Sequence, residues 1–281
     1  SNLGFFTGEK RIRVKWHGED VINLSCKFLD EGLPTRNIVA SYGKRYLPQK
    51  EYVEPSLEEA LAKVVQTNSK PTKEEVVRCY DYEVQGATVL KPFMGETGHV
   101  GQVATVLKPL ETKSKYAIAL SSSMHEQEAM INPYRATLLS IEQAIRKLVC
   151  VGCDRERIAL LDNFCLGSSK DNKVIWDLVE MARACYDGAK AFGTPFISGK
   201  DSFNNEYKKA DGSSIAIPPS LLISAIGRVE DVELVVSNVL KKEGSALYLI
   251  GKPDFAFGAS LFSSYFGIPC CVNSEIASVC L

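Results

Sequence analysis

The chain has 281 residues, of which 45% are hydrophobic and 24% charged, as is ordinary for a globular protein. Its 33 Lys and Arg residues nearly balance 34 Asp and Glu residues, so no net field favours nucleic acid or an anionic membrane surface. No apolar run reaches the length of a bilayer span, and no signal peptide opens the chain. We therefore expect no nucleic-acid partner and no membrane partner, and one large domain or two ordinary ones.

The nine cysteines indicate free thiols and a cytoplasmic location. Their number is odd, Cys270 and Cys271 are adjacent, and the spacing is irregular, which is not typical of a secreted disulfide framework. Cys150 and Cys153 form one C-x-x-C pair with no second pair, so we expect no zinc site. The pair falls late in a helical pattern, which argues against a thioredoxin-like role.

The N-terminal segment predicts a β-hairpin. Residues 11–16 and 21–26 alternate in polarity, and residues 17–20 read as a turn between them. An isolated hairpin is marginal in water, so residues 1–30 should belong to a sheet whose other strands lie elsewhere. Residues 31–54 contain prolines that interrupt any periodicity and predict irregular structure.

Two short helices are predicted next. Ser56 and Glu59 form a capping box that starts a helix running to about Gln66. A second helix follows Pro71 and ends near Tyr82.

The remaining chain mixes strand-like and helical patterns, which predicts an α+β fold, or an α/β fold with a mixed sheet. Strands are expected at 88–91, 103–107, 116–120, 158–161, 193–197, 215–226 (one or two strands) and 246–250. Longer helices are expected at 133–151 and 174–192, where apolar residues recur at spacings of three and four, with a short helix opening after Gly258.

A polar motif follows the apolar run at 193–197. It consists of Gly199, Lys200, Asp201 and Ser202. A flexible backbone, a cation, a carboxylate and a hydroxyl at one point suit a phosphate or a metal-bound phosphate. The motif is not a Walker A loop, and its alternative interpretation is a turn whose Asp and Ser satisfy backbone N–H groups.

Asp162 and Asn163 follow the strand predicted at 158–161 in the same way. Ligands of α/β sheets lie beyond the carboxyl ends of strands, so two such ends would converge on one edge if the strands were neighbours. The alternative for this pair alone is a turn capped by its own side chains.

Five motifs resemble phosphoribosylformylglycinamidine (FGAM) synthase, which acts in purine biosynthesis. They are DYEVQG (81–86), LLDNFC (160–165), CYDGAK (185–190), GTPFISGKDSFNNEY (193–207) and IPPSLLISAIG (217–227). The resemblance extends from the first hairpin to about residue 267, and motifs this long in this order are highly specific.

The resemblance implies a domain plan. The synthetase of this family has two halves, each with an A subdomain related to AIR synthase and then a B subdomain. Residues 1–54 look like the tail of the first B subdomain and 55–82 like a helical linker. Residues 83–229 resemble the second A subdomain and 230–281 the start of the second B subdomain. The chain thus looks like a piece of a larger enzyme, which explains the isolated hairpin.

The resemblance also implies a reaction, a cofactor and partners. ATP with Mg²⁺ activates the amide oxygen of formylglycinamide ribonucleotide (FGAR), and ammonia from a glutaminase subunit or domain displaces phosphate to give FGAM. In the family, the catalytic His and the main ATP and Mg²⁺ ligands lie in the first A and B subdomains. We therefore assign no catalytic residue here and expect the chain alone to be inactive.

Substrate contact is the role that the resemblance implies for the motif at 199–202. Lys200 would supply a charge to the ribose phosphate, Gly199 and Ser202 would donate hydrogen bonds, and Asp201 would orient Lys200 or the loop. Asp162 and Asn163 would face the substrate from the neighbouring strand end.

An auxiliary nucleotide site of the family aligns with Val103, Gln143 and Lys147. Relatives carry an Asp, a Glu and an Asn there, which suit Mg²⁺. An apolar residue, a neutral amide and a cation stand in this sequence, so we expect no metal site and no tight binding of Mg·ADP.

Two alternatives remain open. The chain could be a degenerate structural module of the same fold that only packs against the first A subdomain. It could also be a kinase or cyclo-ligase of the same superfold, although the matches at 160–165 and 193–207 argue against this. Because an A subdomain alone exposes the sheet face that meets the other A, we expect that two copies can form a symmetric homodimer through it.

Overall fold

The computed structural model describes residues 2–35, 37–41, 54–67, 73–79, 82–83, 86–251 and 258–266. The chain forms two compact units, Ser1–Val39 and Ala40–Leu281. Within the described ranges, no helix is both long enough and apolar enough to cross a bilayer.

The first unit is the predicted hairpin followed by one short helix. Strands β1 (Arg11–Trp16) and β2 (Glu19–Ser25) pair antiparallel, and helix α1 (Cys26–Glu31) follows directly. His17 and Gly18 form the turn with φ angles of 49° and 88°, which match the right-handed twist of paired strands. None of the described residues of this unit is buried, so the hairpin has no core of its own.

The second unit is built on a six-stranded sheet in the order β3-β6-β7-β12-β8-β9. The strands are β3 (Thr88–Leu90), β6 (Thr105–Leu107), β7 (Ala117–Ser123), β12 (Ser220–Val229), β8 (Cys153–Cys165) and β9 (Phe196–Ser202). All neighbours pair antiparallel except β8 and β9, which are parallel. This mixed sheet with its helices confirms the predicted α+β class.

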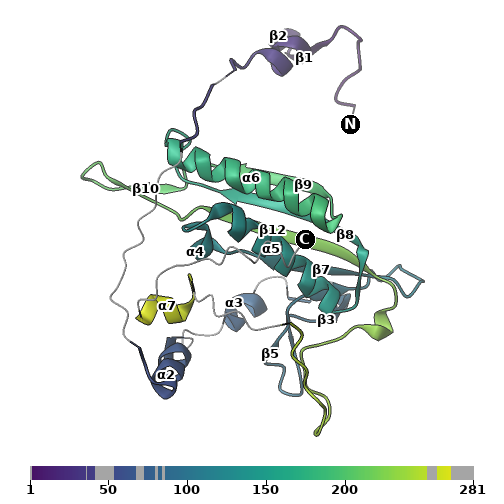
Figure 1. The fold of residues 1–281 in the computed structure, drawn as a ribbon. Helices are drawn as coiled ribbons and strands as arrows, with labels where there is room; N and C mark the ends of the chain where they lie inside the picture. The colour runs from purple at the N-terminus through teal and green to yellow at the C-terminus, as the bar shows by residue number, and fades with distance from the viewer. Residues whose placement is uncertain are drawn as a thin grey trace. The chain divides into compact units, whose positions relative to one another are not determined.

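Two long helices, α5 (Pro133–Cys150) and α6 (Asn172–Phe192), pack side by side on one face of the sheet (Figure 1). Asn132 caps α5, because its side-chain oxygen accepts a hydrogen bond from the third residue of the helix. The two helices approach closely at Gly188, where a Cβ atom would lie 2.8 Å from Ile141 Cδ1.

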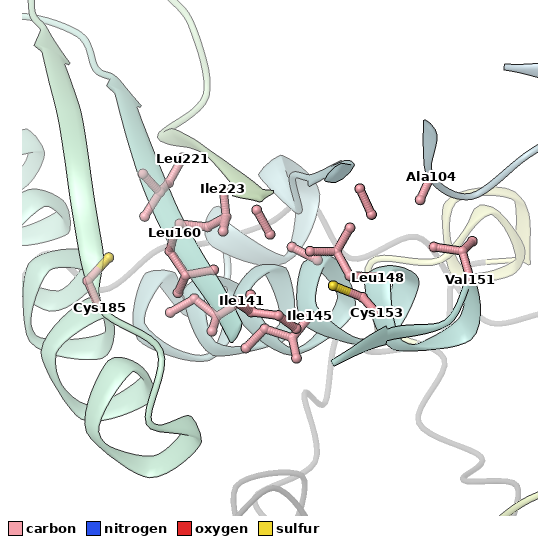
Figure 2. Packing of buried hydrophobic residues seen from close by; sticks show 14 of the residues in the cluster. Ala104, Ile141, Ile145, Leu148, Val151, Cys153, Leu160, Cys185, Leu221 and Ile223 are labelled. Carbon is pink, nitrogen blue, oxygen red and sulfur yellow. The ribbon is translucent and has the colours of Figure 1, made fainter. Parts of the chain in front are cut away.

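The core lies between these helices and the sheet. Figure 2 shows Ile141, Ile145 and Leu148 of α5 packed toward Leu160 and Ile223 of the strands. All five side chains are at most 4% exposed. Each contributes about 1.5–3 kcal/mol by leaving water, so this layer holds α5 to the sheet.

The opposite face of the sheet is only partly buried, and we call it the open face. Along β7 and β12 the side chains alternate between buried and partly exposed positions, as strand geometry requires. The apolar residues of the open face include Ile118, Leu120, Leu161, Leu222 and Ile226. Ile118 and Leu120 are 37% and 39% exposed.

The second unit also contains smaller elements. They are helices α2 (Leu57–Thr67), α3 (Glu74–Cys79), α4 (Glu126–Ala129) and α7 (Leu261–Phe266), the 3-10 helix η2 (Val232–Leu234), and the hairpins β4 (Phe93–Met94) with β5 (Val100–Gly101) and β10 (Glu206–Lys208) with β11 (Ser214–Ala216). The Ser56 hydroxyl accepts a hydrogen bond from the Glu59 N–H and confirms the predicted cap. Helix α3 is described as far as Cys79, and the two residues before Tyr82, near which it was expected to end, lie outside the described ranges. The sequence patterns predicted neither α4 nor the β4–β5 hairpin.

The boundaries predicted at 158–161 and 193–197 were wrong. Strand β8 runs from Cys153 to Cys165, and β9 begins at Phe196 and continues to Ser202. Gly, Asp and Ser favour turns, which is why the polar motif looked like a loop. Hydrogen bonding to β8 makes it a strand instead.

Residues 246–250 do not form the predicted strand. Leu247, Tyr248, Leu249 and Ile250 are between 79% and 97% exposed. An apolar run with high β-propensity becomes a strand only when another strand pairs with it, and no described segment does so here.

We predict that Gly193→Ala lowers the free energy of unfolding by about 1 kcal/mol, because Gly193 ends α6 with a left-handed φ of 65°. Nothing lies within 4 Å of the added Cβ, so the cost is conformational. Urea unfolding of the chain measures it. Gly193→Asn should cost less, because Asn tolerates this conformation, and equal losses for both variants would contradict the explanation.

Candidate functional site

The structure brings the two polar segments together. Strands β8 and β9 are parallel neighbours, and Asp162 pairs with Gly199 while Asn163 pairs with Lys200. The convergence expected for neighbouring strands is therefore present. The residues lie within the paired strands, and not in loops beyond them.

Asp162 and Gly199 lie on the helix-covered face of the sheet. Asp162 lines a cavity with Cys185 and Ala189 of α6. A Cβ atom on Gly199 would lie only 2.3 Å from the Asp162 Oδ1 atom, so the two residues meet directly. Asp201 lies two residues beyond Gly199 and shares its face.

Asn163, Lys200 and Ser202 project from the opposite, open face, because successive side chains on a strand alternate. The Cys165 thiol donates a weak 3.6 Å hydrogen bond to the Asn163 side-chain oxygen, consistent with both being on this face. The six predicted site residues thus divide into two groups. Asn163, Lys200 and Ser202 are one group, and Asp162, Gly199 and Asp201 are the other.

Asp162 is a half-buried carboxyl group under the backbone of β9. Burial raises its pKa above the ordinary value, and the negative charge of Asp201 acts in the same direction. The backbone N–H of Lys200 donates a hydrogen bond to the carboxylate and partly opposes the shift. Asp162 therefore interacts with the strand that carries Lys200.

Asn205 anchors the end of β9. Its side-chain NH₂ donates hydrogen bonds to the carbonyl oxygens of Leu166 and Ser202, both at 2.9 Å. The Ser202 hydroxyl donates to the Asn205 side-chain oxygen at 3.1 Å. The Ser202 proton is thus engaged by Asn205 and is not free for the expected donation to substrate, so the Ser202 oxygen remains as an acceptor. Site prediction from sequence missed Asn205 as an anchor, although its preference for turns was a signal.

Lys200 is exposed, and no described residue forms a hydrogen bond or ion pair with its ammonium group. The orienting role expected for Asp201 has no such contact with Lys200 in the described structure. An unengaged cation beside an amide and a hydroxyl oxygen can bind an anionic group.

A cavity of about 620 Å³ lies between α6 and the start of β9. Its walls are mainly apolar and include Phe164, Ala182 and Phe196, while Asp162 and Thr194 supply polar atoms. The Thr194 hydroxyl is buried and has no hydrogen-bond partner in the structure. We call this the α6 cavity.

The positions aligned with an auxiliary nucleotide site do not fit a metal-bound nucleotide. Lys147 Nζ donates to the Ser122 carbonyl oxygen at 2.7 Å, and the Gln143 side-chain oxygen accepts from the Ser123 hydroxyl. Burial lowers the pKa of Lys147, and Val103 offers only an apolar side chain. An ammonium group and an engaged amide do not form a Mg²⁺ site.

The C-x-x-C pair does not form a thiolate site. Cys153 is buried, its thiol donates to the Arg228 carbonyl oxygen at 3.1 Å, and burial raises its pKa to about 12. Cys150 is exposed at the end of α5. Across the described ranges, no three His, Cys, Asp or Glu side chains are grouped as metal ligands.

Comparison with known proteins identifies relatives of this chain. Residues 101–229 match the family model of the AIR synthase related protein, N-terminal domain. The phosphoribosylformylglycinamidine synthase subunit PurL of Thermoplasma acidophilum is 28% identical over 272 residues, covering 95% of this chain and 34% of the relative. The PurL subunit of Methanocaldococcus jannaschii is 31% identical over 268 residues, covering 92% and 34%.

Solved structures show the same fold. The structure of PurLQS from Thermotoga maritima aligns with a TM-score of 0.57 at 23% identity, covering 81% of this chain and 33% of that chain. PurL of T. maritima complexed with FGAR aligns with a TM-score of 0.54 at 24% identity, covering 81% and 32%. The chain is a homologue of the PurL subunit and spans about a third of its length.

We predict that Asp162 makes stability fall as the pH rises. Its folded-state pKa lies above the unfolded value of about 3.9, so the folded state binds more protons between the two values. The free energy of unfolding, measured as wild type minus Asp162→Asn, should therefore decrease across this interval. Urea unfolding at a series of pH values from about 3 to 7 tests this.

Asp211→Asn is the matched control. Hydrogen bonds from Ser213 lower the pKa of Asp211 in the folded state. The free energy of unfolding of wild type minus that of Asp211→Asn should therefore rise with pH, from the lowered folded-state pKa up to the unfolded pKa of about 3.9. A difference for Asp162 that also rises with pH, or stays constant, would contradict the assignment.

Proposed function

We propose that the chain is part of an FGAM synthase and helps to bind FGAR for its ATP-dependent amidation in purine biosynthesis. The observation that carries this proposal is the group of Asn163, Lys200 and Ser202 on the open face. Asn163 and Lys200 are paired neighbours, and both lie within motifs that resemble the family. The AIR synthase related match and the PurL relatives support the same reading.

The domain plan is part of this proposal. Residues 1–54 would be the tail of a first B subdomain, 55–82 a linker, 83–229 the second A subdomain, and 230–281 the start of the second B subdomain. The match at 101–229 lies inside the proposed A subdomain. The hairpin β1–β2 buries none of its described residues, as expected if its sheet belongs to another segment.

In this reading, the residues bind and orient substrate and transfer no proton. Lys200 supplies a point charge to the ribose phosphate of FGAR, the Asn163 amide offers a donor, and the Ser202 oxygen remains an acceptor. ATP, when bound elsewhere in the complete enzyme, supplies the phosphoryl group that activates the amide oxygen. No Mg·nucleotide step is assigned to Gln143 and Lys147, since their contacts do not suit one.

The proposed partners are the rest of the synthetase and a glutaminase that supplies ammonia. One solved relative is PurLQS from T. maritima, and another is T. maritima PurL complexed with FGAR. We infer a cytoplasmic location from the free cysteines. In the described part of the chain, the free thiols are those of Cys26, Cys79, Cys150, Cys153, Cys165 and Cys185.

A second candidate is a structural module of the same fold that binds no substrate and pairs with another A subdomain or with a second copy. The partly exposed apolar side chains of the open face, including Ile118 and Leu120, favour this role. The two candidates differ in what Lys200 does, because a purely structural module has no use for an unengaged ammonium group.

We predict that the purified chain alone forms no FGAM from FGAR, ATP and ammonia, because the family resemblance places the catalytic residues in the first A and B subdomains. A coupled ADP-release assay measures this, with a complete PurL subunit as positive control. Turnover by the chain alone would overturn the proposed division of the enzyme.

We also predict that Lys200→Ala in the complete synthetase raises the KM for FGAR about tenfold or more and changes kcat by less than about twofold. The loss of one charged contact to a non-reacting phosphate weakens ground state and transition state alike.

Lys113→Ala is the matched control, since Lys113 is an exposed lysine in the loop before β7. It should leave both constants unchanged. An unchanged KM in Lys200→Ala would favour the structural module.

A further inference from the structure

Strand β9 lies at the edge of the sheet and pairs with β8 alone. Its register is irregular near its start, because Leu160 pairs with Phe196 while the next residue, Leu161, pairs with Ser198. Ile197 is therefore the extra residue of a bulge. The motif with Lys200 begins directly after this irregularity.

The face on which Lys200 projects depends on this register. A slip of one residue would move every side chain of β9 to the other face, and Lys200 would then project toward α6. Edge strands with polar sequences carry little apolar patterning to prevent such a slip, and from Ile197 to Asp201 every residue is exposed. Phe196 before this stretch and Phe203 after it pack against the core, so the exposed residues between them need a further interaction to define their register.

Asp162 meets β9 at the position where the register needs definition. A Cβ atom on Gly199 would lie 2.3 Å from Asp162 Oδ1 and 2.8 Å from its Cγ, so a side chain at this position would force the carboxyl group to move. The neighbours of Gly199, Ser198 and Lys200, both carry a Cβ that would collide there after a slip. The backbone N–H of Lys200 also donates a hydrogen bond to the carboxylate.

We propose that Asp162 and Gly199 form a register lock that holds Lys200 on the open face. Asp162 is then a positioning residue that acts through the backbone of Lys200 and does not itself touch substrate. This proposal rests on the proposed function for its consequence on FGAR binding, but the lock itself is a property of the chain alone. The α6 cavity beside Asp162 means that shortening this side chain does not disturb close packing against the helix.

The lock is tested on the chain by site-resolved amide hydrogen exchange. Asp162→Ala should speed exchange at the Lys200 amide about tenfold or more, while amides of β12 stay unchanged. Asp162→Asn, which keeps the volume and an acceptor oxygen, should show a smaller effect and also covers the case in which Asp162→Ala fails to fold. Asp154→Ala, in the same strand β8 but away from β9, is the control.

A double-mutant cycle tests the steric part. Gly199→Ala should disturb β9 in the wild-type background and be nearly silent when Asp162 is already Ala, because the colliding atoms are gone. Additive effects of the two substitutions, or unchanged exchange at Lys200 in Asp162→Ala, would overturn the lock.

The consequence for function is read in the complete synthetase. Because Asp162→Ala removes the proposed lock, it should raise the KM for FGAR about tenfold and leave kcat nearly unchanged, and Asp162→Asn should raise the KM less. Faster exchange at Lys200 with an unchanged KM would support the lock and contradict the role of Lys200 in substrate binding. A failure of the lock and a failure of the proposed function therefore give different results.

Discussion

The parallel pairing of β8 with β9 is the interaction on which the candidate site depends. All other neighbours in the sheet are antiparallel. In the six-stranded sheet, β8 and β9 are therefore the neighbouring strands that end at the same edge, and their polar residues pair with one another. The pairing places Asn163 beside Lys200 and Asp162 under Gly199. Because side chains alternate across a strand, one register decides which residues can reach a ligand and which support the backbone from behind.

The two faces of the sheet have different roles: one carries the core and the other carries the exposed Lys200. The face under α5 and α6 contains the core, with Leu160 and Ile223 fully buried, and it also holds the half-buried carboxyl group of Asp162. The open face combines partly exposed apolar residues with the Lys200 group. In the proposed synthetase, this would let one surface both meet the rest of the enzyme and present a cation to FGAR, while the chemistry of ATP takes place elsewhere.

Much of the fold could be predicted from the sequence, because the signals were local. Helix α5 begins at Pro133 as Asn132 indicates, and α6 follows its apolar periodicity within two residues. The extent of β9 could not be predicted, since its polar residues become a strand only through pairing with β8. The site residues were identifiable by motif, but their division between two faces depends on a bulge at Ile197 that no local pattern shows. Residues 246–250 show the converse, because strand propensity without a partner produced no strand.

In the proposed synthetase, alternate residues of β9 face the substrate. Single cysteines placed by Ser198→Cys, on the open face, and Asp201→Cys, on the helix face, test it in the complete synthetase through site-resolved alkylation followed by mass spectrometry. We expect saturating FGAR to slow alkylation at position 198 and to leave position 201 unchanged. Protection at position 201, or none at position 198, would show that the open face of β9 does not meet FGAR.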